Sequence, residues 1–126
     1  MSTKEIVLNI DKAIASHGMW KMRLRNAIKT HTSEFDVAFV KSPHNCEFGK
    51  WLDNDKAFLN SHQEYNIIFD LHKKLHFETA RIMDLALSRK DNEASSAIAI
   101  GSDFATTSSK LTIAMMNWKK GLKEVA

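Results

Sequence analysis

The sequence contains few of the residues that interrupt helices. Its 126 residues include only four glycines and one proline, and these are the two residue types that most often break regular secondary structure. So few interruptions over this length favour long helices over the many short strands and turns of an all-β protein. A chain of this length also fits a single domain, residues 1–126, which can bury a core without disulfide bonds.

Membrane-spanning and secretory signals are also lacking. No apolar run approaches the ~20 residues that a helix needs to cross a bilayer, and the N-terminal MSTKEIVLNI lacks the architecture of a cleavable signal peptide. We therefore expect a cytoplasmic protein without membrane insertion.

Excess charge of one sign is absent as well. The formal net charge is only +3, and Lys21, Arg23, Arg25 and Lys29 lie among apolar residues, as on the solvated face of a helix. Nucleic-acid-binding domains usually carry a denser basic stripe or a recognisable motif. We therefore expect no nucleic-acid partner.

Cysteine occurs only once, at position 46. A single cysteine excludes an intramolecular disulfide, so Cys46 is a buried structural thiol, a reactive thiol or a metal ligand. Ser42 and Pro43 are typical of an N-cap and a first-turn proline, which predicts a short helix over residues 44–54. Cys46 would then lie near a helix N-terminus, where the dipole favours the thiolate. Because lone cysteines commonly act as small buried hydrophobes, both roles stay open.

What the sequence does contain is a pair of histidines one helical turn apart. His72 and His76 occur in YNIIFDLHKKLHFETARIM, residues 65–83. Residues at i and i+4 lie on the same helix face, about 5–6 Å apart between Cβ atoms, so both imidazoles can reach one metal ion. They replace apolar residues on the predicted core face, and an unpaired buried imidazole costs about 1–3 kcal/mol. They therefore need hydrogen-bond partners or a metal.

A third histidine lies on the apolar face of the predicted N-terminal helix. Ser2 and Glu5 have the spacing of a capping box, and the helix should end near His31. His17 lies on its inward face, where a histidine bonded to a carbonyl or a water is commoner than a metal ligand. The full inward face, at spacings of three and four, is Ile6, Ile10, Ala13, His17, Trp20, Leu24 and Ala27.

The rest of the chain predicts two more long helices and their connections. Residues 32–41 are expected to form a loosely ordered apolar connection over the bundle end, and residues 53–60 a second connection. Ser61 and Glu64 have capping-box spacing before the histidine helix, and residues 91–93 form a turn before the last helix. The inward positions of the histidine helix are Tyr65, Ile68, His72, Leu75, His76, Thr79, Met83 and Leu87, and those of the last helix are Ile98, Gly101, Phe104, Ser108, Leu111, Met115, Trp118 and Leu122.

These patterns predict an all-α fold, an antiparallel four-helix bundle with an additional short helix carrying the cysteine. Ligands on facing helices converge in the core of such a bundle. The inward residues able to bind a soft divalent metal are His17, Cys46, His72 and His76, whereas His44 and His62 look more exposed. Three nitrogens and one sulfur suit a tetrahedral zinc ion.

Three motifs resemble the chemoreceptor zinc-binding (CZB) domain family. They are AIASHGMWKMRL, with a histidine shortly before a tryptophan, the cysteine motif NCEFGKWL, and the spaced pair DLHKKLH. The resemblance implies that the same four residues are zinc ligands, that Trp20 and Trp51 are supporting core residues, and that the domain forms a homodimer.

The resemblance also implies a regulatory role. Such domains are attached to bacterial chemoreceptors and diguanylate cyclases, and zinc occupancy or oxidation of the ligand cysteine controls their signalling output. The present sequence carries no signalling coiled coil and no cyclase domain. We therefore expect either a domain of a longer protein or a free-standing member that acts through a partner.

Two alternatives come from other classes of protein. A hemerythrin-like bundle binding oxygen at a di-iron centre needs about five histidines with bridging carboxylates, or Glu-x-x-His pairs. The sequence has no Glu-x-x-His, and Glu64 and Glu78 are not spaced to bridge His72 and His76. The other alternative is a metal-free helical interaction module. A zinc site closed by four protein ligands has no open position for a substrate water, so we expect no enzyme.

Overall fold

The computed structural model describes residues 2–125, and the side chains of residues 2–122. These residues form helices and connections without a strand, which confirms the all-α class. The helices are α1 (Thr3–Gly18), α2 (Trp20–Thr30), α3 (Val37–Lys41), α4 (Glu47–Asn54), α5 (Lys56–Leu59), α6 (Glu64–Leu87), α7 (Asp91–Ala97) and α8 (Asp103–Val125), with a 3-10 turn η1 (Pro43–Asn45) before α4.

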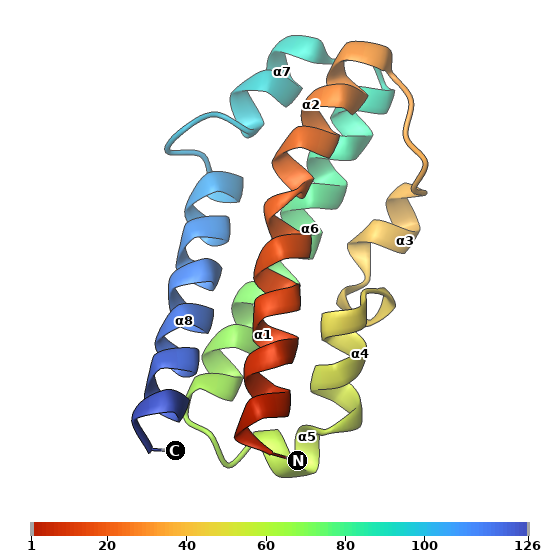
Figure 1. Ribbon diagram of the computed structural model, residues 1–126. Helices are drawn as coiled ribbons and strands as arrows, with labels where there is room; N and C mark the ends of the chain where they lie inside the picture. Colours follow the sequence, from red (N-terminus) through yellow and green to blue (C-terminus); the bar gives the residue numbers. More distant parts are fainter. Residues whose placement is uncertain (1, 126) are drawn as a thin grey trace.

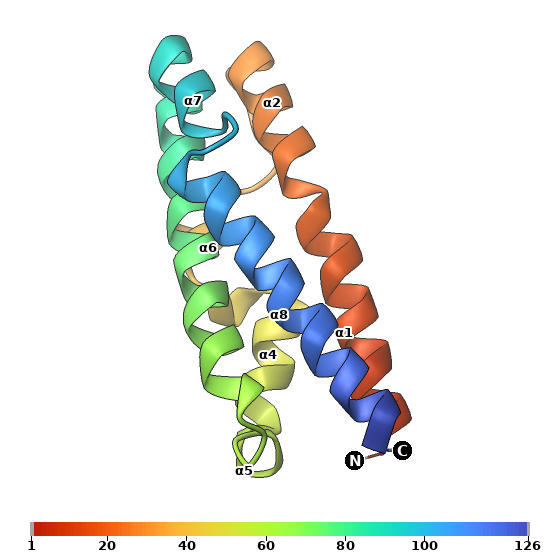
Figure 2. The same ribbon diagram turned by 90° about the vertical axis from the view of Figure 1, so that its left-hand side faces the viewer.

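The helices form four antiparallel columns (Figure 1). Helices α1 and α2 run away from the end that holds both termini, the short helices α3 to α5 run back, α6 runs away again, and α8 returns. Figure 2 shows α8 lying between α6 and α1, and it packs on both. The predicted bundle is confirmed. The short helix expected over residues 44–54 is divided, however: η1 ends at Asn45 and α4 begins at Glu47, so Cys46 is the N-cap of α4 and does not lie within it.

The N-terminal column is a nearly continuous helix. Ser2 Oγ accepts a hydrogen bond from the Glu5 N–H at 3.1 Å, as the capping spacing predicted. The helix is interrupted at Met19, whose N–H donates to the Ser16 carbonyl instead of continuing the regular ladder. It ends at His31, which has a left-handed φ of 60°. All its predicted inward residues are buried except Trp20, which is half-buried.

The segment after this column differs from the prediction. Residues 32–41 were expected to be a loose connection over the bundle end, but α3 forms there and packs along α6. Val40 is its buried residue. A single buried valine suffices because α3 packs along α6, a long helix that already presents an apolar face. This placement brings the Val40 carbonyl within hydrogen-bond distance of His76.

Three expectations about helix boundaries are wrong. Helix α6 begins after Gln63 without a side-chain cap, because Ser61 Oγ donates to the Phe58 carbonyl at 2.9 Å instead. The expected connection over residues 53–60 also contains α5. The last helix begins later than predicted, since residues 91–97 form α7 and a turn separates it from α8.

Gly101 accordingly has a different role from the one predicted. It was placed on the inward face of the last helix, but it is exposed and lies in the turn between α7 and α8. Its φ of 87° is a left-handed conformation that glycine adopts without strain. No neighbouring atom lies within 4 Å of the position that a Cβ would take.

The core lies between α1, α6, α8 and the short α4. The predicted inward residues of α6 are buried, apart from the half-buried Leu87. Tyr65 is buried among them and donates its hydroxyl hydrogen to the Leu52 carbonyl at 3.1 Å, which ties α6 to α4. In α8, the buried residues are Phe104, Thr107, Leu111, Met115 and Trp118. None of the helices in the described part of the chain is both long and apolar enough to span a bilayer.

Candidate metal centre

Four potential metal ligands from three separate segments meet inside the bundle. His17 comes from α1, Cys46 from the residue before α4, and His72 and His76 from α6. One ligand atom from each lies within 4.8 Å of all the others. Cys46 Sγ is 3.2 Å from His72 Nε2 and 4.0 Å from His17 Nε2. The two Nε2 atoms of His72 and His76 are 3.0 Å apart.

These separations suit a tetrahedral metal. With zinc–nitrogen bonds of about 2.0–2.1 Å and a zinc–sulfur bond of about 2.3 Å, ligand atoms at the corners of a tetrahedron lie about 3.3–3.6 Å apart. The observed separations, from 3.0 Å to at most 4.8 Å, lie on both sides of that range. Imidazole nitrogen and thiolate sulfur are also the ligand types that zinc takes in structural sites. The residues present therefore fit a zinc ion.

Backbone carbonyls orient two of the imidazoles. The Nδ1–H of His17 donates to the Ala13 carbonyl at 2.8 Å, and that of His76 donates to the Val40 carbonyl at 2.7 Å. Because a carbonyl only accepts, Nδ1 must carry the hydrogen and Nε2 keeps a lone pair. Both lone pairs face the centre of the cluster, the arrangement found for metal-bound histidines.

Burial keeps the histidines neutral. It lowers the pKa of His17 to about 4, with the neighbouring His76 adding to the effect. Burial and the nearby His76 and His17 lower the pKa of His72 to about 2. Burial also lowers the pKa of His76, although its hydrogen bond to the Val40 carbonyl opposes this. Neutral imidazoles are the form that binds a metal, so no proton has to leave them at pH 7.

Cys46 is the N-cap residue of α4. Its Sγ accepts a hydrogen bond from the Gly49 N–H at 3.3 Å, so the helix terminus does favour the thiolate, as the sequence predicted. Burial outweighs this contribution, however, and raises the pKa of the thiol overall. The expected net stabilisation of the thiolate is therefore wrong for the metal-free site. Deprotonation of Cys46 would accompany metal binding.

Gly49 lets the turn before α4 approach the helix. A Cβ on this residue would lie 1.6 Å from the Pro43 carbonyl oxygen and 3.2 Å from His72 Cε1. The absence of a side chain at Gly49 therefore permits this close approach, and the neighbouring backbone is the η1 turn. Any larger residue would displace the backbone that carries Cys46.

The two predicted supporting tryptophans lie on different sides of the cluster. Trp20 packs against Phe35, with ring centroids 5.4 Å apart. Trp51 packs against Phe48 and Trp118 at 5.7 and 6.0 Å, and Phe48 in turn contacts the rings of His17 and His72. Both tryptophans are half-buried. The indole Nε1 of Trp51 is buried without a hydrogen-bond partner.

The remaining histidines lie outside the cluster. His44 is exposed and pairs with Asp53, and His62 Nδ1 accepts a hydrogen bond from the Trp118 indole at 3.2 Å. Sequence reasoning missed the carbonyls of Ala13 and Val40, which orient two of the imidazoles. The i−4 position of Ala13 relative to His17 was a usable signal, whereas nothing in the sequence pointed to Val40.

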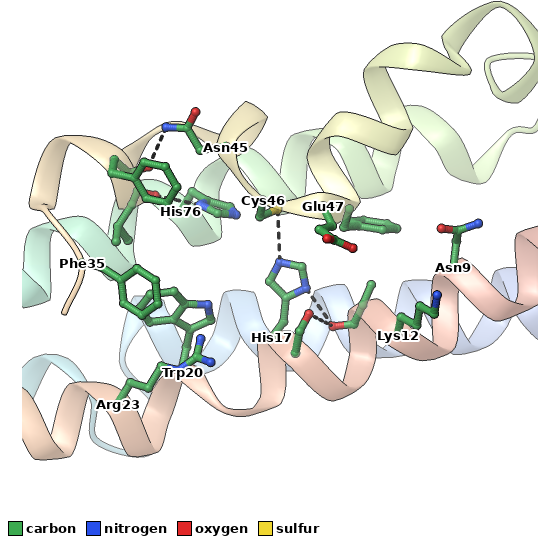
Figure 3. A pocket seen from close by; sticks show the side chains of 15 residues that line it. Asn9, Lys12, His17, Trp20, Arg23, Phe35, Asn45, Cys46, Glu47 and His76 are labelled. Carbon is green, nitrogen blue, oxygen red and sulfur yellow. Dashed lines mark hydrogen bonds between the residues drawn. The ribbon is translucent and has the colours of Figure 1, made fainter. Parts of the chain in front are cut away.

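Around the described residues, the larger of two cavities beside the cluster lies on the side of Cys46 and His17. A cavity of about 450 Å³ is lined by His17, Cys46 and His76, with walls from α1, α2 and α3 (Figure 3). On the other side, beside His72 and Gly49, the cavity measures only about 10 Å³. Solvent molecules therefore reach the cluster past Cys46 and His17.

Comparison with known proteins agrees with this geometry. Residues 17–83 match the chemoreceptor zinc-binding domain, and the match begins at His17 and includes the other three cluster residues. The chain belongs to this family. The matched segment is more than half of the 126 residues. No curated protein and no solved structure matches the chain.

Family membership and the three-histidine, one-cysteine cluster together support a zinc-binding signalling domain. In the chemoreceptor zinc-binding domain family the role is regulatory and sensory. The cluster offers only imidazole and thiol groups, which are the ligands that zinc accepts in closed structural sites.

Proposed function

We propose that His17, Cys46, His72 and His76 bind one zinc ion, and that the chain regulates a signalling partner according to the state of this site. The observation that carries the proposal is the convergence of four ligand atoms from three segments that are far apart in the sequence. A site closed by four protein ligands suits regulation rather than hydrolysis, because no position is left for a substrate water.

The chain's own residues would connect the metal site to the fold. His72 and His76 hold their positions on α6, and His17 holds its position on α1 through the Ala13 carbonyl. Cys46 is attached to α4, which belongs to the column made of short helices. When bound, zinc would supply a cross-link between these three segments. Its loss would therefore affect the Cys46 segment most.

Oxidation of Cys46 is a second way to break this link. A two-electron oxidant such as hypochlorous acid transfers an oxygen to the thiolate sulfur, which becomes a sulfenate, while the oxidant is reduced to chloride. A sulfenate is a poorer zinc ligand than a thiolate. The freed η1 turn and α4 would then present a different surface to a partner.

We further propose that residues 1–126 act as one cytoplasmic domain and form a homodimer that controls a chemoreceptor or a diguanylate cyclase, in cis or in trans. Helix α8, which follows the matched segment, packs on α1 and α6 and so supports one domain. Exposed apolar side chains on α6 and α8 support association with a second copy. They include Ile67, Ile113 and Met116.

Metal analysis of tag-free protein tests the zinc site. We expect one zinc per chain and loss of zinc in Cys46→Ala and His72→Ala. His44→Ala is the matched control, because His44 lies two residues from Cys46 but outside the cluster. Cobalt substitution should give a thiolate-to-metal absorption band that Cys46→Ala abolishes.

Two results would contradict the proposal. One is Cys46→Ala protein that keeps wild-type zinc affinity and an unchanged response to hypochlorous acid. The other is an absorption spectrum of an oxo-bridged di-iron centre in the purified protein, since zinc is colourless. A zinc content well below one per chain would favour the metal-free interaction module.

A further inference from the structure

The cavity beside the metal centre is large enough for a small organic molecule. Its volume of about 450 Å³ falls within the roughly 300–1,000 Å³ of typical ligand pockets. Figure 3 shows Cys46 and His17 facing each other in its middle, with Trp20, Arg23 and Phe35 toward one end and Lys12 toward the other. A molecule bound there would lie directly against two of the four cluster residues.

One end of the cavity is a wall of aromatic rings. Trp20 and Phe35 pack with centroids 5.4 Å apart, and Phe35 stacks on Phe39 at 6.5 Å with an angle of 15° between the ring planes. Phe39 remains 49% exposed although it lines the cavity. Flat aromatic surface left open to a pocket favours a planar, partly apolar ligand.

The cavity also carries an excess of positive charge. Arg23 holds its guanidinium over the Trp20 ring at 4.9 Å and the Phe35 ring at 5.4 Å. Lys12 lines the other end, and Glu47 is the acidic residue of the lining. Among the described side chains, neither Arg23 nor Lys12 forms an ion pair with a carboxylate. A guanidinium at the edge of a pocket is well suited to bind a carboxylate.

We propose that this cavity binds a small aromatic carboxylate, with the ring against Trp20 and Phe35 and the carboxylate at Arg23. The bound molecule covers the open side of Cys46. It also contacts α3, whose Val40 carbonyl orients His76. Binding itself does not require the metal, whereas its effect on the metal centre rests on the proposed function. The ligand would be a second input, which protects the thiol and steadies the site.

Titration of isotope-labelled protein with benzoate tests the proposal by nuclear magnetic resonance. The Trp20 indole signal should shift saturably, with a Kd of about 1 mM or tighter. The indoles of Trp51 and Trp118 serve as internal references because they do not line the cavity. Benzyl alcohol and benzylamine, the neutral and cationic counterparts of benzoate, should bind more weakly. The titration is done with zinc and again with a chelator present.

Two charge variants should change benzoate affinity in opposite directions. This distinguishes a role of the side chains in binding from a role in the stability of the fold. Arg23→Gln should weaken benzoate binding about fivefold, and Glu47→Gln should strengthen it about twofold. Arg25→Gln is the matched control, because Arg25 is on the same helix but does not line this cavity.

In metal-free protein, saturating benzoate should slow alkylation of Cys46 by N-ethylmaleimide several-fold.

The proposal is overturned if benzoate leaves the Trp20 signal unmoved, or if Arg23→Gln binds benzoate as tightly as wild type. Equal binding of benzoate and benzylamine would also overturn it. These outcomes are distinct from failure of the zinc site. Protein that holds no zinc but binds benzoate in an Arg23-dependent way would contradict the proposed function and support this inference.

Discussion

His72 and His76 lie within a 24-residue helix, whereas Cys46 lies between a three-residue 3-10 turn and an eight-residue helix. Helix α6 packs against α2, α3, α7 and α8, so its two imidazoles are held by most of the bundle. Cys46 is connected to that bundle mainly through the few buried residues of α4. The same site is therefore assembled from a well-supported half and a weakly supported half.

This difference teaches where a signal can arise. Energetic coupling needs an element whose equilibrium the site can bias, and a long helix buried on several sides is a poor candidate. The Cys46 segment, by contrast, buries no residue of η1 and three residues of α4. We infer that the histidines on α6 act as a fixed frame and that the cysteine segment responds.

Removing zinc should lower the stability more than any other change. It should also show that the Cys46 segment and the α6 histidines respond differently. With free zinc about a thousandfold above its Kd, the lost stabilisation is about 4 kcal/mol. Amide hydrogen exchange should accelerate by at least about tenfold in residues 42–54, with much less change in residues 68–83. Mass-spectrometric exchange with and without a chelator measures this. Equal acceleration in both segments would mean that the halves are not held differently.

Lowering the pH should destabilise the metal-free protein through its buried histidines. The pKa of His17 is lowered to about 4 in the folded protein, against about 6.5 in the unfolded chain. The unfolded state therefore binds more protons between these pH values, and stability present above pH 6.5 is lost as the pH falls toward 4. In metal-free protein each such buried histidine contributes a slope on the order of 1 kcal/mol per pH unit.

Urea denaturation at several pH values between 7.5 and 5 measures that slope. His17→Gln removes one titrating group, so the slope should become shallower while Cys46→Ala leaves it unchanged. The thiol does not titrate in this range because burial raises its pKa. An unchanged slope in His17→Gln would show that the acid sensitivity arises elsewhere.

The well-supported half was also the half that sequence reasoning described best. A long helix repeats its inward positions over several turns, so the apolar pattern of α6 and the placement of His72 and His76 followed from spacing. Helix α3 has five residues and one buried valine, which is too little for a pattern. Gly101 was misplaced because a glycine on an apolar face fits both a close helix contact and a turn.

Two features of the site depend on the folded structure. The sign of the Cys46 pKa shift depends on how deeply the thiol is buried, and a helix N-terminus alone predicted the opposite sign. The Val40 carbonyl that orients His76 is a backbone group, so no residue type announces it. Contacts of this kind join segments that the sequence keeps far apart.

Gly49→Ala should destabilise the segment that carries Cys46, by less than the removal of zinc does. The added Cβ would meet the Pro43 carbonyl oxygen at 1.6 Å, so the η1 turn has to move away from α4. Overpacking of this kind costs about 1–3 kcal/mol, and zinc affinity should fall because Cys46 lies on the displaced segment. Gly121→Ala is the control, since no atom lies near its Cβ position. That change in helix α8 should raise stability by up to about 1 kcal/mol.

His44→Ala should have the smallest effect of all. His44 lies on η1, two residues before Cys46, and its partner Asp53 is on α4, so the pair joins the two pieces of the cysteine half. Both side chains are exposed to solvent, however, at 59% and 36%, and such pairs contribute at most about 1 kcal/mol. If the zinc site and the Gly49 contact hold this segment, zinc affinity should change less than about twofold. A larger loss, measured by competition with a chelator, would mean that the surface pair supports Cys46 and that the cysteine half is better anchored than its short helices indicate.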